Sequence, residues 1–150
     1  MSLFRVKYLS FFLGLISIFS FFNIIYSYYF NLYLNLNTYY FSLIISSILA
    51  LVFYNIQSDD KKPSIYEKIL TVFLGYFLLP LILSIPFYFS IYNLTFFNSL
   101  FESVSGFTST GFTIFENIKH IDPGLILWRS SIQWLGGLYF LFSIVFLIDI

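Results

Sequence analysis

Four long apolar runs set the strongest constraint on how this chain can fold. They extend over approximately residues 8–30, 38–56, 65–91 and 124–150. Since about 20 apolar residues cross the hydrocarbon core of a bilayer as a helix, we predict four transmembrane spans. The composition agrees, because 59% of the 150 residues are hydrophobic and 9% are charged. The zero net charge and the absence of cysteine give no indication of nucleic-acid binding, disulfides or thiolate metal sites.

The first two apolar runs predict a transmembrane hairpin that occupies residues 1–57. Arg5 and Lys7 precede the first run, as in a signal peptide, but the run is too long and no clean cleavage site follows it. We therefore expect a retained helix. A charged loop with several lysines, residues 58–68, follows the hairpin. Under the positive-inside rule, this loop and the N-terminus lie in the cytoplasm.

A short polar stretch, residues 101–112, separates the last two runs and carries hydroxyls, two glycines and one carboxylate. We predict a helix over residues 95–106 that enters the membrane without crossing it, and a turn over 108–112 that leaves it. Non-helical backbone at membrane depth is tolerated only where protein buries it or where it lines a watery cavity. Carbonyl oxygens in such a turn can replace the water shell of a monovalent cation. Gly111 permits the left-handed backbone that the turn requires.

Two motifs in this region resemble one family of transporters. The run Phe101-Glu102-Ser103-x-Ser105-Gly106-Phe107-Thr108-Ser109-Thr110-Gly111 resembles the first pore loop of the Trk/Ktr/HKT superfamily of potassium transporters. Downstream, Trp128-Arg129-Ser130-x-x-Gln133-Trp134-Leu135-Gly136-Gly137 resembles the start of the following helix in the TrkH/KtrB branch. The resemblance covers the chain from about Tyr66 onward. It implies an all-α membrane protein in which the N-terminal hairpin precedes one helix–pore loop–helix repeat, residues 69–150.

The resemblance implies potassium uptake across the cytoplasmic membrane through a filter of backbone carbonyls. Members of the family carry four such repeats that build one filter together, and this chain carries one repeat. The implied ligands of K+ are the carbonyls of Ser109 and Thr110, with Thr108, Gly111 and Phe112 as neighbours. This route involves no covalent chemistry, so we expect neither enzymatic activity nor an organic cofactor in this chain.

Charged residues and glycines near the predicted filter have expected structural roles. Because a lone charge at membrane depth is costly, we expect Glu102 of the short helix to pair with Arg129 of the fourth span. The alternative is that each side chain snorkels separately to the interface. The resemblance assigns the packing of the last helix to Gln133, Trp134, Gly136 and Gly137. The TrkH pattern continues with Met-Gly, whereas this chain has Leu138-Tyr139, whose bulk argues against an equally tight contact.

The resemblance also implies partners and a location. We expect a homodimer of complete subunits in the bacterial inner membrane, with the pore loop facing outside, and a cytoplasmic TrkA- or KtrA-like subunit that binds the nucleotide. Three alternatives remain open: a non-conducting membrane scaffold or assembly subunit, a truncated fragment without transport of its own, and four copies that assemble as a simple potassium channel. The sequence also leaves open whether the chain is whole or a fragment, and whether the pore prefers potassium to sodium.

Overall fold

The computed structural model describes residues 7–56 and 64–148, and within these ranges all regular secondary structure is helical. Four stretches are long and apolar enough to cross a membrane: α1 (Lys7–Tyr29), α2 (Leu36–Asn55), α3 with α4 (Ile65–Leu83 and Ile85–Tyr88), and α6 (Pro123–Ile148). The prediction of an all-helical chain with four membrane-length spans is therefore confirmed. Arg5, Lys61 and Lys62, on which the expected orientation depends, lie outside the described residues.

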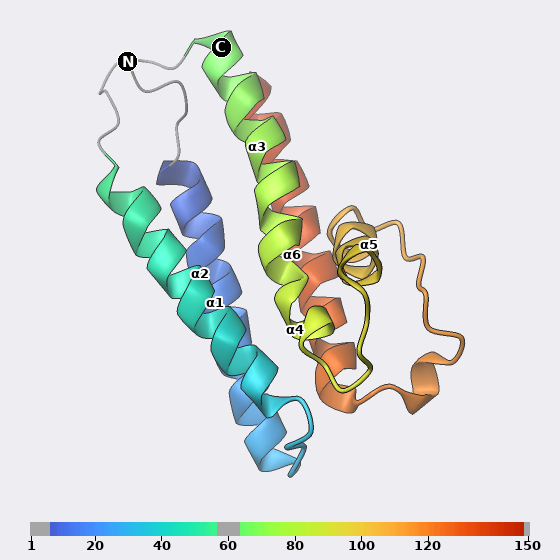
Figure 1. Cartoon of the computed structure of the whole chain (residues 1–150). Helices are drawn as coiled ribbons and strands as arrows, with labels where there is room; N and C mark the ends of the chain where they lie inside the picture. The colour runs from blue at the N-terminus through green and yellow to red at the C-terminus, as the bar shows by residue number, and fades with distance from the viewer. Residues whose placement is uncertain (1–6, 57–63, 149–150) are drawn as a thin grey trace.

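The four spans alternate in direction along the bundle (Figure 1). One end of the bundle holds Lys7, Asn55, Ile65 and Ile148, and we call it the terminal end. The opposite end holds the turn between α1 and α2, the short helix α4 and the start of α6, and we call it the loop end. Two further elements, α5 (Phe96–Phe107) and the 3₁₀ turn η1 (Ile118–His120), belong to the segment that connects α4 with α6.

Buried and half-buried serines join α1 to α2 into a hairpin. The Ser20 hydroxyl donates to the Ser42 hydroxyl at 3.0 Å, and the hydroxyls of Ser17 and Ser47 lie 2.7 Å apart. In a lipid environment, small polar residues let two helices approach closely, and hydrogen bonds between them replace bonds to water. The hairpin is thus held by polar contacts as well as by apolar packing.

The third apolar run is interrupted near the loop end. A capping box begins α3, in which the Ser64 hydroxyl accepts from the backbone N–H of Glu67 and the Glu67 carboxylate accepts from the N–H of Ser64. We expected one helix as far as Ile91, whereas α3 stops at Leu83 and a single turn, α4, follows Ser84. Proline has no N–H, so Pro86 cannot continue the helical hydrogen-bond ladder at this point.

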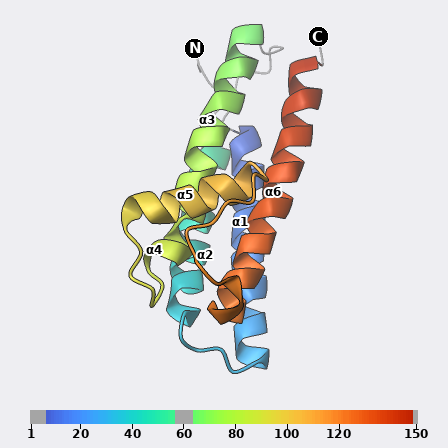
Figure 2. The same ribbon diagram turned by 90° about the vertical axis from the view of Figure 1, so that its right-hand side faces the viewer.

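The short helix α5 lies across the long helices rather than beside them. Thr95 caps it, because the Thr95 hydroxyl accepts from the backbone N–H of Asn98 at 3.3 Å. Its 12 residues have a length of about 18 Å, well short of a bilayer core. Figure 2 shows the end of α5 meeting α6 about halfway along the length of α6. The chain then returns to the loop end. The connecting segment thus starts and finishes at the same end of the bundle.

Candidate functional site

The C-terminal end of α5 is closed by a compact backbone turn. The N–H of Ser109 donates to the carbonyl of Gly106 at 2.9 Å, and the N–H of Thr110 donates to that of Ser105 at 3.0 Å. These two bonds form the Schellman arrangement that ends many helices. Ser109 has a φ of 55° and Gly111 a φ of 83°. The left-handed backbone expected at Gly111 is present, and it also occurs at Ser109, where it costs a non-glycine residue about 1–2 kcal/mol.

The carbonyl oxygens of this turn fall into two groups. Those of Gly111 and Phe112 accept hydrogen bonds from Nη2 of Arg129, at 3.3 and 3.1 Å. The Phe112 carbonyl also accepts from the Ser105 hydroxyl at 2.7 Å. By contrast, no donor within the described ranges reaches the carbonyl oxygens of residues 108–110, and these residues are exposed. The turn therefore has three exposed residues whose carbonyl oxygens have no hydrogen-bond donor among the described residues.

Glu102 and Arg129 form a buried ion pair behind the turn. Nη1 of Arg129 lies 2.9 Å from Oε2 of Glu102, whose side chain is fully buried. The other carboxylate oxygen of Glu102 accepts from the Thr113 hydroxyl and from the N–H of Ile114, both at 2.6 Å. The pair therefore connects α5, α6 and the returning chain, and neither side chain extends separately to an interface.

Two hydroxyl residues complete this network, although the sequence had given them no role. The Ser105 hydroxyl fixes the Phe112 carbonyl, and Thr113 bridges the Glu102 carboxylate to the backbone of the following loop. Ser105 could have been found from its spacing, because it lies three residues after Glu102 on the same helix face. No such signal exists for Thr113, because it lies in an irregular segment.

The side chains of the turn remain at the surface of this chain. The Thr108 hydroxyl donates to the Val104 carbonyl at 2.8 Å and lies 2.6 Å from the Thr110 hydroxyl. Among the described residues, the Ser109 side chain has no hydrogen-bond partner. An open cavity of about 430 Å³ adjoins the turn, and its walls include Tyr76, Phe107, Thr108, Ser109, Gly136, Gly137 and Phe140.

The four residues expected to pack the last helix have different surroundings. Gly136 lies against the backbone of Phe107, at a place where a Cβ atom would collide with the Phe107 carbonyl. Gly137 has open space around it, with nothing within 4 Å of a Cβ atom. Gln133 and Trp134 are exposed, although the Trp134 ring contacts Phe19 of α1 at 5.5 Å between centroids. Among the described residues, Gly136 is the one of these four whose lack of a side chain permits a close backbone contact.

The bulk of Tyr139 does not separate α6 from α3. Its hydroxyl lies where a Cβ atom of residue 75 would otherwise stand, and that residue is glycine. The hydroxyl donates to the Val72 carbonyl of α3 at 3.0 Å. The side chain is fully buried. Tyr139 therefore packs closely against α3, because Gly75 provides the space that its side chain fills.

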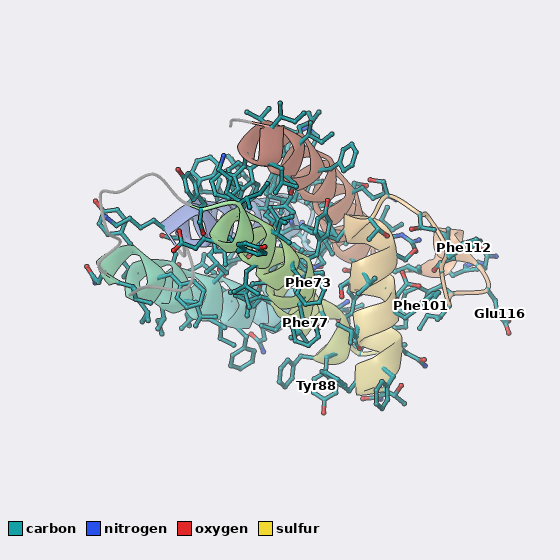
Figure 3. The ribbon with its side chains drawn as sticks, turned by 90° about the horizontal axis from the view of Figure 1, so that it is seen from above. Phe73, Phe77, Tyr88, Phe101, Phe112 and Glu116 are labelled. Atoms are coloured by element: carbon teal, nitrogen blue, oxygen red, sulfur yellow. The ribbon has the colours of Figure 1, made fainter. Side chains whose placement is uncertain are left out.

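Apolar side chains also cover the surface around the turn. Phe101 of α5, Phe112 of the turn, and Phe73 and Phe77 of α3 are all exposed. Figure 3 shows Phe101 and Phe112 on the side of α5 that lies away from the bundle, with Glu116 farther along the same loop. A surface of this composition suits contact with lipid or with other protein segments at membrane depth.

The fold and this site define a multi-pass, all-helical membrane protein with a short, non-spanning helix and a polar turn between its last two spans. No protein-family model and no solved structure matches the chain significantly. The chain is 47% identical to the Trk system potassium uptake protein TrkI of Halomonas elongata over 60 residues, which is 40% of this chain and 11% of that protein. It is 41% identical to TrkG of Escherichia coli over 46 residues, 31% of this chain and 10% of that protein.

A wider match reaches an uncharacterized cation transporter of Methanocaldococcus jannaschii, with 27% identity over 110 residues. It covers 71% of this chain and 23% of that protein. The chain is thus homologous to Trk-type potassium uptake proteins, of the TrkH/KtrB kind, over part of its length. The matched regions amount to less than a quarter of the length of each of these relatives.

Proposed function

We propose that this chain supplies one pore-loop unit of a potassium uptake protein. The proposal rests on residues 108–110, which are exposed and whose carbonyl oxygens receive no hydrogen bond from the described residues. They follow the end of the short helix α5, which meets α6 about halfway along α6. Uncompensated carbonyls at membrane depth are costly unless water or a cation satisfies them. The relatives that carry the name of potassium uptake proteins support K+ as that cation.

The carbonyls of the turn have two different roles in this proposal: some bind the ion, and others hold the turn in place. Carbonyl oxygens at residues 108–110 are free to replace the water shell of K+, and the C-terminal dipole of α5 adds partial negative charge there. Gly111 and Phe112 are occupied by Arg129, so we assign them to holding the turn rather than to binding the ion. Of the five carbonyls that were candidate ligands of K+, those of residues 108–110 remain. The transported ion needs no covalent chemistry, which supports a transporter rather than an enzyme.

One turn can surround an ion on one side only, so the proposal requires partners. The exposed face around the turn would contact the remaining pore repeats, supplied by the same polypeptide or by other chains. Potassium would enter from the outer side, at the loop end, and move down the membrane potential. A homodimer of complete subunits and a cytoplasmic, nucleotide-binding TrkA- or KtrA-like subunit are the partners that we propose.

Rubidium uptake tests the proposal directly. The full coding region that contains this sequence is expressed in cells that lack their own potassium uptake systems, with Gly111→Asp as the test variant and Gly14→Ala as the control for changing a glycine. Gly111 has a φ of 83°, whereas Gly14 is helical and a Cβ atom there meets nothing within 4 Å. We expect the first change to abolish uptake at unchanged protein abundance and the second to preserve it.

Three results would redirect the assignment. Uptake unaffected by Gly111→Asp would remove the turn from the ion path. No uptake by the unaltered protein, at normal abundance, would favour a scaffold or assembly subunit instead. Equal uptake of sodium and rubidium would leave a pore but would contradict selectivity for potassium.

A further inference from the structure

Tyr139 joins α6 to α3 through an unusually close contact. The side chain is fully buried, and its hydroxyl donates to the Val72 carbonyl at 3.0 Å. The hydroxyl occupies the space that a side chain at Gly75 would need, because an added Cβ atom would collide with it and would stand 2.9 Å from Leu9. The tyrosine and the glycine therefore match each other in size, and neither can change alone without displacing its neighbours.

The same tyrosine supports the end of α5. Its ring lies 5.5 Å from the ring of Phe107 and 5.0 Å from that of Tyr76, distances typical of favourable aromatic contacts. Phe107 is the last residue of α5 and precedes the turn directly. Its backbone rests on Gly136, which lies one helical turn before Tyr139 on α6. The ring and the backbone of Phe107 are thus both supported by one face of α6.

We infer that Tyr139 and Gly75 are positioning residues for the ion site. The contact between them sets how closely α3 and α6 approach, and this approach sets the place of Phe107 and of the carbonyls at residues 108–110. The inference rests on the proposed function, because it assigns selectivity to residues that do not touch the ion. A change at this contact should therefore alter the preference between ions rather than only the amount of protein.

The test variant is Gly75→Ala in the full coding region, with Gly14→Ala as its matched control. Both changes add one methyl group to a glycine within a helix, but only the first meets another side chain. Rubidium and sodium uptake are measured in parallel and normalised to membrane abundance. We expect the ratio of rubidium to sodium uptake to fall by about fivefold or more in Gly75→Ala and to stay within twofold in Gly14→Ala.

A suppressor variant distinguishes a specific clash between residues 75 and 139 from a general loss of stability. In a Tyr139→Leu background the ring and hydroxyl that collide with the new methyl group are gone, and the remaining close atom is the end of the flexible Leu9 side chain. Gly75→Ala should then cause little further change in the ratio. Coupling of this kind is expected for residues in direct contact and not for distant ones. An equal loss from Gly75→Ala in both backgrounds would overturn the inference.

A second readout does not depend on transport. The sequence has no cysteine, so Ser109→Cys places a single thiol in the turn once any cysteine outside this sequence is replaced by serine. We expect Gly75→Ala to change the rate at which a charged thiosulfonate reagent modifies this thiol by about fivefold, and Gly14→Ala to leave it unchanged. An unchanged rate in Gly75→Ala would overturn the inference. Absence of rubidium uptake by the unaltered protein would contradict the proposed function alone.

Discussion

Removal of Arg129 should destabilise the protein more than removal of both members of its ion pair. In Arg129→Met the fully buried Glu102 keeps two hydrogen bonds on Oε1 but loses the cation beside Oε2. Leaving one buried charge without its partner costs about 3–5 kcal/mol. The carbonyls of Gly111 and Phe112 also lose their bonds to the arginine.

The double variant Glu102→Gln/Arg129→Met removes the uncompensated charge. The double variant still lacks the arginine donors to the two carbonyls. We therefore expect its free energy of unfolding to be lower than that of the unaltered protein by about 1–3 kcal/mol, the usual range for hydrogen bonds made by a charged group. Equilibrium unfolding in detergent micelles measures both values, followed by the fluorescence of the buried Trp128 in a background in which the exposed Trp134 is replaced by phenylalanine. Because both variants lose the bonds to the carbonyls, the single variant should be less stable than the double variant by the cost of the unpaired charge, about 3–5 kcal/mol.

A charge-reversed variant, Glu102→Arg/Arg129→Glu, is the decisive control. It restores an ion pair, but a glutamate at 129 cannot donate to the carbonyls of Gly111 and Phe112. Likewise an arginine at 102 cannot accept from the Thr113 hydroxyl. We expect no recovery of stability or of rubidium uptake. Recovery of both would refute the reasoning, because it would show that only the charge pair matters and not its bonds to the turn.

Three further changes test other parts of the structure. Gly136→Ala should prevent normal accumulation in the membrane, because its methyl group collides with the Phe107 backbone, whereas Gly137→Ala, with open space around it, should accumulate normally on immunoblots. Ser109→Gly should raise the free energy of unfolding by roughly 0.5–1 kcal/mol, because it relieves a left-handed serine. Trp128→Phe should lower the free energy of unfolding by about 1 kcal/mol, because it removes the 3.1 Å hydrogen bond to the backbone of α3. Thermal unfolding measures this change.

The long spans could be predicted because hydropathy is a property of the local sequence. In lipid, the backbone N–H and C=O groups of each apolar run have to form hydrogen bonds within one helix, whatever elements lie beside it. The break at Ser84 was missed, although Pro86 was visible, because prolines inside membrane helices often cause only a kink. Whether a helix continues past such a proline depends on tertiary packing, which the local sequence does not show.

The sequence predicts the ion pair of the site but not the packing around Tyr139 or the backbone of Ser109. Glu102 and Arg129 could be matched because charges at membrane depth are few and opposite charges attract. The space opposite Tyr139 could not be foreseen, because Gly75 lies 64 positions earlier in the chain and no local pattern connects the two. The left-handed Ser109 was likewise unexpected, since serine has no strong preference for that backbone and Gly111 was the obvious candidate.

The central claim is that the carbonyls at residues 108–110 bind the ion while those of Gly111 and Phe112 are held by Arg129. Solid-state NMR of the full protein in lipid, with ¹³C-labelled carbonyls in threonine, serine, glycine and phenylalanine, tests it most directly. When sodium is replaced by potassium, we predict that the carbonyl resonances of residues 108–110 shift and that those of Gly111 and Phe112 change far less. Unchanged resonances at 108–110, or a response confined to Gly111 and Phe112, would contradict the account.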